Sequence, residues 1–471
     1  MTTKIKNLLV LVFFLFFTVS TAQEEVQELR KILSFKEYLG YVKKHHPLVK
    51  QANLELSIGE VNLLKARGGF DPKIEVDYDR KKFKETEYFD QLNATFKIPT
   101  WYGIEFKANF EENSGEFLNP DLTVPEDGLY SAGVSFSLAQ GFLINERMAM
   151  LKKAKFYVSQ TSAQRELLVN NLIFEASKAY FKWLEASNEL KIYSSFLTNA
   201  EIRFSGVKRN VEVGEKPAID SIEAKIIVKN RKLNLEAARL TMRKAKLKVS
   251  NYLWVNNVPL EVQHNVVPII PEDEVLSLYF KKANTESVLM NHPKLRSLEA
   301  KKNVIKVDRS LYRNKLLPKL DVQYNFLAQD ATRLNNFNAS NYKAFANFSF
   351  PLFLRKERGN LKMASIKLQD INLETVSASQ GIQNKIDATI AEINSLEVQK
   401  NIVVGMVTDY ETMLIAEDRK FELGESSLFL INSREQKLIE VKLKANAITV
   451  KLLNANASMY NAMGVSNAAI N

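Results

Sequence analysis

The sequence contains no cysteine and only four histidines, and it lacks the short motifs that mark many catalytic or metal sites. The absence of cysteine excludes disulfides, thiolate metal sites and a lipid-modified cysteine. No HExxH, GxSxG, phosphate-binding loop or GxGxxG opening a helix after a strand is present. We interpret His45, His46 and His292 as structural, because they stand beside prolines. The sequence therefore predicts no catalytic residue, no cofactor and no metal site, and a protein that is not an enzyme.

Long apolar runs are missing as well, except near the N-terminus. Lys4 and Lys6 precede an apolar stretch at residues 8–17, and small residues follow at 20–22. This pattern predicts a secretory signal peptide over residues 1–22. No later stretch approaches 18 uninterrupted apolar residues, so we expect no transmembrane helix. An exported chain of this kind is either soluble or inserted as a β-barrel.

The net charge of +11 does not indicate a nucleic-acid partner. Lysines and arginines are spread along helical patterns among acidic residues, for example Lys225 and Lys229 close to Glu223. A basic stripe with interleaved aromatic residues would be expected for nucleic-acid binding. Mixed charge is typical of a solvated helix surface instead.

The chain is internally duplicated, because five short segments of the first half return in the same order in the second half. In order, the pairs are His46-Pro47 and His292-Pro293, residues 72–78 and 318–324, residues 134–138 and 348–352, residues 213–215 and 423–425, and residues 250–252 and 458–460. Five landmarks in one order make chance resemblance a poor explanation.

Each repeat follows one plan of short helices, strands and a long helical hairpin. Prolines 47 and 293 stand at permitted first-turn positions of helices, whereas prolines 72 and 318 stop helices and begin extended segments. The first repeat is predicted at 23–254, with strands at about 72–138 and a helical hairpin at about 142–254. A linker at 255–272 follows. The second repeat is predicted at 273–471, with strands at about 318–352 and a helical hairpin at about 356–463. Shorter helices are predicted at about 35–45, 47–67, 273–290 and 293–316.

The long helices carry apolar seams. Between Leu168 and Val211, apolar or small residues recur at steps of three and four. This spacing is the coiled-coil period, and a helix over 142–211 would be roughly 105 Å long at about 1.5 Å per residue. The return helices show similar seams over 235–252 and 438–462. We therefore expect long antiparallel helical hairpins that pack against other helices.

The segments between the helices alternate between apolar and polar residues, as in Ile74, Val76 and Tyr78. This period of two predicts strands with one apolar and one polar face. Aromatic residues crowd these strands, which fits either sheet propensity or the aromatic girdles of outer-membrane barrels. The first repeat carries additional residues, and the stretch at about 84–128 forms either an extra hairpin or a long loop.

One chain offers roughly four to six membrane-length strands, which are too few to close a barrel alone, because single-chain membrane barrels have at least eight. An open sheet edge cannot persist in lipid. Several copies must therefore share one barrel if the strands cross a membrane, and three copies with four strands each would give twelve. The charged helices must project into an aqueous compartment. The fold class is thus mostly α-helical with a membrane β-barrel.

With these features the sequence resembles the TolC-like outer membrane efflux protein family. The duplication, the His-Pro helix starts, the strand starts at Pro72 and Pro318, and the VGE and LGE turns carry the resemblance. It implies a homotrimer with a shared 12-stranded barrel in the Gram-negative outer membrane and a periplasmic α-barrel. It also implies outer-membrane lipid contact and export driven by an inner-membrane pump of the RND or ABC type through a periplasmic adaptor (membrane fusion) protein.

The resemblance places a periplasmic tip at the two glycine turns. The candidate residues for adaptor contact are Val213, Gly214, Glu215, Phe421, Leu423, Gly424 and Ser427. The family often carries acids six and nine residues after the glycine, which are Asp220 and Glu223 in the first repeat but Leu430 and Ser433 in the second. Glu422, Glu425 and Glu435 are the candidates to supply entrance charge instead. Rings of carboxylates would favour cations despite the positive net charge.

A different class of protein competes with this hypothesis, namely a periplasmic coiled-coil adaptor or scaffold without a pore. Such a protein would have one helical hairpin and no paired membrane strands. The alternating aromatic segments argue against it. The exported substrate is chosen largely by the pump and cannot be read from this chain.

Overall fold

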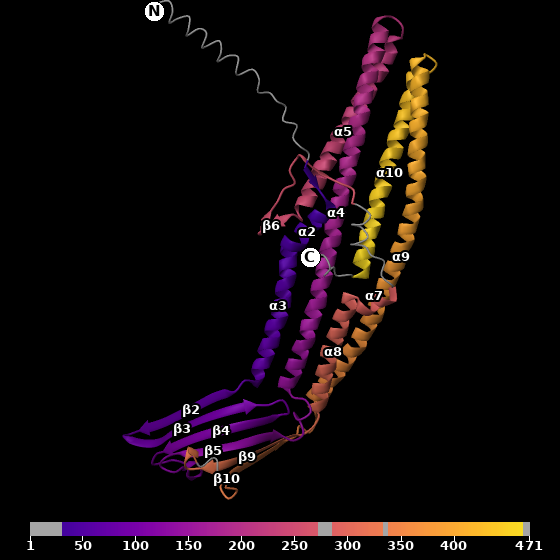
Figure 1. Cartoon of the computed structure of the whole chain (residues 1–471). Helices are drawn as coiled ribbons and strands as arrows, with labels where there is room; N and C mark the ends of the chain where they lie inside the picture. The colour runs from indigo at the N-terminus through magenta and orange to yellow at the C-terminus, as the bar shows by residue number, and fades with distance from the viewer. Residues whose placement is uncertain (1–30, 272–284, 333–337, 465–471) are drawn as a thin grey trace, which may run out of the picture. The chain divides into compact units, whose positions relative to one another are not determined.

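The computed structural model describes residues 31–271, 285–332 and 338–464 (Figure 1). The predicted signal peptide at 1–22 lies outside the described residues, as does the part of the predicted short helix before Thr285. The elements below carry the labels of Figure 1.

Two very long helices dominate the described residues and confirm the predicted helical hairpins. α4 and α9 have 67 and 68 residues. The helices of the first repeat are α2 (Phe35–His45), α3 (Pro47–Arg67), α4 (Glu146–Glu212) and α5 (Ala218–Ser250), and those of the second are α7 (Thr285–Asn291), α8 (Pro293–Asn314), α9 (Arg355–Glu422) and α10 (Leu428–Met463). Within the described ranges, none of these helices is both long enough and apolar enough to cross a membrane.

α4 begins at Glu146 rather than near residue 142, because an asparagine caps its first turn. The side chain of Asn145 accepts a hydrogen bond from the backbone N–H of Met148 at 2.8 Å. An asparagine that satisfies one of the free N–H groups of the first turn fixes where a helix begins.

The two His-Pro pairs form helix caps, which is a structural role of the kind that the sequence predicts for His46 and His292. The Nδ1 atom of His46 accepts from the N–H of Leu48 at 3.2 Å, and that of His292 accepts from Lys294 at 3.1 Å. Both histidines are buried. The Nε2 atom of His292 lies 3.2 Å from the carbonyl oxygen of Ala462 and donates to it, so the imidazole is neutral with its proton on Nε2.

Six strands form one antiparallel sheet in the order β10-β9-β5-β4-β3-β2 (Figure 1). Their bounds are β2 (Lys73–Phe83), β3 (Thr86–Pro99), β4 (Ile104–Ser114), β5 (Leu129–Ser137), β9 (Lys319–Ala328) and β10 (Tyr342–Ser349). β2 and β9 leave the ends of α3 and α8, whereas β5 and β10 lead into α4 and α9. Because all strands are antiparallel, these four connections lie at one end of the sheet, which we call the near end.

The register separates the side chains into two faces. Ile74 lies opposite Phe96, Phe106 opposite Val134, and Ala346 opposite Val322, so apolar residues align on one face across the strands. This face also carries an aromatic stack of Tyr324 on Tyr342 at 5.3 Å. Because side chains alternate along a strand, the intervening residues form the opposite face.

The opposite face is polar and is hydrogen-bonded across the strands. Lys97 pairs with Glu75, the Lys107 ammonium donates to Gln323 at 3.0 Å, and the Ser137 hydroxyl donates to Asp321 at 2.8 Å. A polar cavity of about 510 Å³ opens on this face at the near end of the sheet, and Lys107, Gln323 and Asp321 are among its lining residues. One face of the sheet is therefore suited to an apolar environment and the other to water.

The open alternative at residues 84–128 is resolved in favour of a hairpin followed by a loop. β3 and β4 occupy residues 86–99 and 104–114, and the segment before β5 is a loop with one 3-10 turn. The sheet consequently has six strands. Six is the upper end of the four to six strands that the sequence offers, so the arithmetic of three copies with four strands each does not apply to this sheet.

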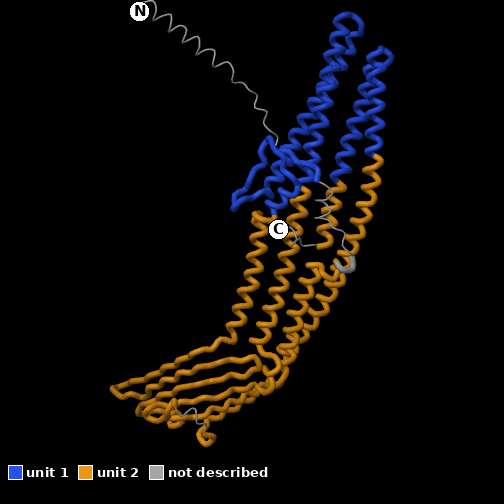
Figure 2. The backbone as a smooth tube through the Cα atoms, viewed as in Figure 1, with its two compact units in different colours: residues 1–42, 179–273, 403–450 blue, residues 43–178, 274–402, 451–471 orange. Residues whose placement is uncertain are grey.

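The chain divides into two compact units, and each takes segments from both repeats (Figure 2). Unit 1 comprises residues 1–42, 179–273 and 403–450, and unit 2 comprises 43–178, 274–402 and 451–471. Unit 1 contains both glycine turns and a core in which Trp183 and Tyr180 are fully buried. Unit 2 contains the sheet and the helices α3, α7 and α8.

Acidification should weaken unit 2 through His292. Burial lowers the pKa of His292 from its usual 6.5, an effect that its bond to Ala462 opposes and the charge of Lys385 strengthens. The folded state thus binds fewer protons than the unfolded state, so this stability is complete above pH 6.5 and is lost as the pH falls through the lowered pKa. Protonation would also remove the Nδ1 acceptor that caps α8.

We expect the melting temperature of the wild-type protein to fall between pH 7.5 and pH 5.5, and to fall less in His292→Asn, which keeps a capping side chain but does not titrate. Replacing the exposed His264 by asparagine provides the control. An equal pH dependence in wild type and His292→Asn, measured by thermal unfolding, would contradict this role.

Candidate functional site

The candidate site consists of two turns in unit 1, each at the end of a long helical hairpin. Residues 213–217 join α4 to α5, and residues 423–427 join α9 to α10. The sequence-predicted site residues lie in or beside these turns, except Glu435, which lies two helical turns into α10.

Both turns have the same backbone geometry. Gly214 and Gly424 adopt positive φ values of 81° and 78°. The N–H of Gly214 donates to Val211 at 3.1 Å, and the N–H of Glu215 reaches back to Asn210 at 2.8 Å. Gly424 and Glu425 repeat this pair of bonds at the same distances. This is the Schellman motif, which needs a left-handed residue just after the helix and therefore favours glycine.

The helices that follow the turns begin in different ways. α5 begins after Pro217, and Asp220 lies in its first turn, where a negative charge interacts favourably with the positive end of the helix dipole. α10 begins after Ser427, whose hydroxyl accepts from the N–H of Leu430 at 3.3 Å. Asp220 and Ser427 therefore have structural roles whatever else they contact.

Apolar side chains are exposed at both turns. Val213 is 64% exposed and Leu423 is 74% exposed, and the first turns of the following helices add Ile219 and Phe429. Clustered exposed apolar residues mark surfaces that other proteins or lipids cover. The turns thus offer an apolar surface on a rigid backbone.

The candidate charges differ in their surroundings. Glu215, Glu422 and Glu425 are exposed, whereas Glu223 is partly buried and accepts from the Asn432 amide at 3.3 Å. The Lys216 ammonium lies 4.1 Å from the centre of the Phe421 ring. These contacts join the two hairpins of one chain, and a small apolar cluster of Val207, Ala224 and Leu428 packs beside them.

Glu435 has a different environment from the other acids, because it is fully buried and held between two arginines. Arg203 donates to one of its carboxylate oxygens at 3.2 Å, and Arg231 donates to the other at 3.3 Å. Arg231 is itself buried and also donates to Gln436 at 2.7 Å. This burial argues against Glu435 as a charge that faces an open passage. Its carboxylate instead links α4, α5 and α10.

Sequence reasoning missed the two arginines, although a signal was present. Glu435 and Arg231 fall on the apolar seams of α10 and α5, three and four residues before Leu438 and Leu235. Charged residues at seam positions are costly unless they are paired. Asp418 lies close by, and burial raises its pKa above the usual value, with Arg203 opposing this shift and Glu435 adding to it.

Among the described residues, no group of three or more histidines and carboxylates gathers at metal-binding distance.

The glycines of the turns should respond to substitution in the opposite direction from a glycine inside α4. Gly214→Ala and Gly424→Ala should each weaken their turn by about 1 kcal/mol, because an L-residue is strained at positive φ. Gly206→Ala is the control, because Gly206 lies within α4 with open space around its position, and it should stabilise the helix by about 1 kcal/mol.

Amide hydrogen exchange at Glu215 and Glu425 measures this difference directly, because their N–H groups make the bonds that close the turns. Faster exchange in Gly206→Ala than in Gly214→Ala would contradict the assignment.

Neutralising Glu435 should loosen the helices near the turns. Glu435→Gln removes the carboxylate that pairs with both arginines, of which Arg203 also lies 3.7 Å from Asp418. Breaking a buried ion pair costs about 3–5 kcal/mol. Glu440→Gln is the matched control, because Glu440 is exposed on the same helix and pairs only with Lys437 and Gln436 among the described residues. Hydrogen exchange along α10 should rise strongly in the first variant and hardly in the second. Equal exchange in both would show that the buried cluster contributes little.

The comparisons with known proteins concern the family and the fold. Residues 285–465 match the sequence model described as outer membrane efflux protein. No curated protein matches the chain.

Solved structures share the fold at low sequence identity. The structure of CusC has a TM-score of 0.66 at 14% identity and covers 91% of both chains. The open state of the Neisseria gonorrhoeae MtrE outer membrane channel has a TM-score of 0.66 at 14% identity, with 92% of this chain and 89% of that chain covered. The Campylobacter jejuni CmeC outer membrane channel has a TM-score of 0.64 at 13% identity, with 91% and 85% covered.

At these identities the structural matches establish a common fold, and the family model matches most of the second repeat. Together they confirm the resemblance to the outer membrane efflux protein family predicted from the sequence, with residues 285–465 as the part of the chain that matches the family model.

Proposed function

We propose that this protein is the outer-membrane exit duct of an efflux or secretion machine. The observation that carries the proposal is the two-faced sheet, with one apolar face, one polar face and all four helix connections at one end. Strands of this kind fit a membrane barrel whose apolar side meets lipid and whose polar side lines a water-filled passage. The match of residues 285–465 to the outer membrane efflux protein model supports the same function.

The strand lengths support a membrane location. β2 and β4 have 11 residues each, β9 has 10 and β5 has 9, and a tilted membrane strand needs about 9–11. The near-end turn between β3 and β4 is short, whereas β4 and β5 are joined at the far end by a loop over 115–128. Short turns on the periplasmic side and long loops outside are typical of outer-membrane barrels.

Several copies of the chain would share the barrel, and we propose a homotrimer in the outer membrane of a Gram-negative bacterium. The long helices would lie in the periplasm, because they are rich in charged residues on their exposed sides. A periplasmic adaptor would contact the turns at Val213, Gly214, Glu215, Phe421, Leu423, Gly424 and Ser427, and an inner-membrane pump would supply the energy. The exposed apolar side chains at Val213 and Leu423 favour such a contact.

Cell fractionation tests the location and separates the duct from a scaffold without a pore. The duct should remain in the outer membrane as detergent-resistant oligomers, and deleting its gene should raise the sensitivity of the cell to exported compounds. Release of the protein by osmotic shock would contradict the proposal and favour a soluble scaffold.

The exposed carboxylates at the turns should bias the passage toward cations. Glu215→Gln combined with Glu425→Gln should shift the reversal potential in planar bilayers toward weaker cation preference, because rings of carboxylates attract cations. Glu55→Gln with Glu60→Gln removes two exposed acids from α3 as the matched control and should leave the potential unchanged. An unchanged potential in the first variant would exclude Glu215 and Glu425 as selectivity residues.

A further inference from the structure

The sheet has two edges that the chain itself does not close. Within the described residues, β2 is paired only with β3, and β10 is paired only with β9. Each edge therefore presents backbone N–H and C=O groups without ladder partners. In lipid such groups must be satisfied, because no water is available to bond them.

The two edges are complementary in direction and in face. Because the sheet has six antiparallel strands, β2 and β10 run in opposite directions, so β2 of one copy would continue the antiparallel ladder of β10 from another. Aligning their near ends sets Ile74 opposite Phe348 on the apolar face. The same register sets Asp79 opposite Lys343 on the polar face. Shifting the register by two residues would keep both faces intact.

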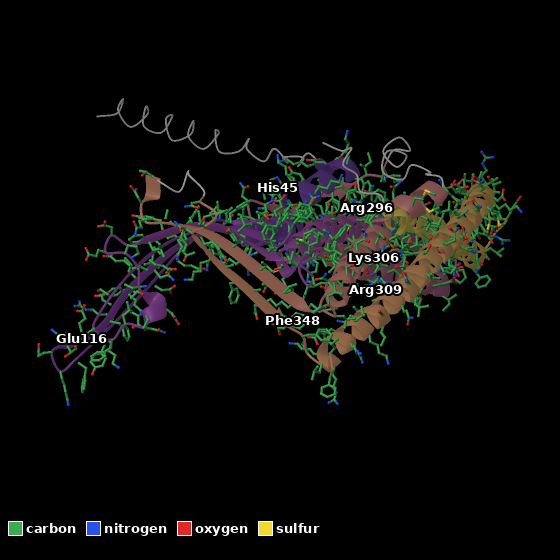
Figure 3. The ribbon with its side chains drawn as sticks, turned by 90° about the horizontal axis from the view of Figure 1, so that it is seen from below. His45, Glu116, Arg296, Lys306, Arg309 and Phe348 are labelled. Atoms are coloured by element: carbon green, nitrogen blue, oxygen red, sulfur yellow. The ribbon has the colours of Figure 1, made fainter. Side chains whose placement is uncertain are left out.

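Figure 3 labels Phe348 on β10, close to the near end of the sheet, and Glu116 in the loop at the far end. The strand register shows that the alternation along both edge strands continues the faces of the existing sheet. A head-to-tail contact of two different edges closes into a ring when the rotation between copies permits.

The additional hairpin is anchored at its near end. Trp101, in the turn between β3 and β4, stacks on Phe70 at 5.6 Å and packs against the buried cluster that contains Met148 and Leu311. The Asn145 side chain also donates to the Trp101 carbonyl at 3.3 Å. The hairpin is thus built into the base of the helices. β3 also covers the edge of β4, so β4 has no free edge.

We propose that the β2 edge of one copy pairs with the β10 edge of the next, so that every copy contributes six strands to the shared barrel. This inference rests on the proposed outer-membrane function, and in a homotrimer it gives eighteen strands. Strands about 4.8 Å apart and tilted by about 40° give a barrel roughly 36 Å across for eighteen strands and roughly 24 Å for twelve. The cross-section of the barrel is therefore about twofold larger than that of a twelve-stranded barrel.

Disulfide trapping tests the pairing, and the absence of native cysteine makes the background clean. Phe345→Cys on β10 is combined in turn with Glu75→Cys, Asp77→Cys or Asp79→Cys on β2, which covers the near-end register and shifts of two residues. All four positions lie on the polar face. Oxidation in isolated outer membranes should give reducible dimers and trimers on a denaturing gel for at least one pair.

The matched control combines Phe345→Cys with Val76→Cys, which lies at the same depth on β2 but on the apolar face, and it should give no covalent oligomers. A competing arrangement with four strands per copy would pair β10 with β4 instead. That arrangement predicts cross-links between Phe345→Cys and Lys107→Cys, and their appearance would overturn the proposal.

The mass of the detergent-solubilised variants distinguishes failure of this inference from failure of the proposed function. An assembled outer-membrane oligomer without any β2–β10 cross-link would refute the six-strand contribution and leave the duct intact. A protein that never assembles in the membrane would refute both.

Discussion

The structure depends on one constraint, which is that every backbone hydrogen-bonding group in a membrane must find a partner. Helices satisfy this rule within themselves, and a sheet satisfies it only when it has no edges. The six-stranded sheet of this chain has two edges, at β2 and β10. In the proposed outer-membrane duct, one copy alone would leave these edges unpaired in lipid. The need for several copies in that proposal follows from the backbone before any side-chain contact is considered.

The helices meet a different requirement, because such long helices must stay packed against one another in water. Their seams of apolar residues pack the helices together, and the two glycine turns reverse the chain with the N–H groups of both glycines and of the glutamates that follow them bonded to carbonyls of the preceding helix. The buried carboxylate of Glu435 adds a polar contact between three helices. Such a contact costs desolvation and contributes mainly when all of its partners are present. This one carboxylate connects α4, α5 and α10.

Much of the fold could be predicted because short-range sequence patterns determine its helices and strands. The period of two placed Ile74, Val76 and Tyr78 on one face, and the His-Pro pairs predicted helix starts that the structure places at Pro47 and Pro293. The duplication predicted two hairpins with like turns, and both turns have the same hydrogen bonds.

The stretch at 84–128 could not be decided from the sequence, because its prolines fit either a loop or strand ends. In the structure Pro99 ends β3, where no further ladder N–H is required, and Pro120 and Pro125 lie in the loop. The environment of Glu435 was equally inaccessible. Its partners Arg203 and Arg231 lie more than 200 residues away in the sequence, so only the three-dimensional packing brings them together. The roles of the turn residues in binding a partner depend on a second protein and remain a proposal.

The most direct test of the central claim is the subunit number of the purified mature protein in mild detergent, measured together with the permeability of liposomes that contain it. Open sheet edges that demand partners predict a single oligomeric species, three copies in the assembly proposed above, that makes the liposomes leaky. A stable monomer that leaves the liposomes sealed would contradict the account.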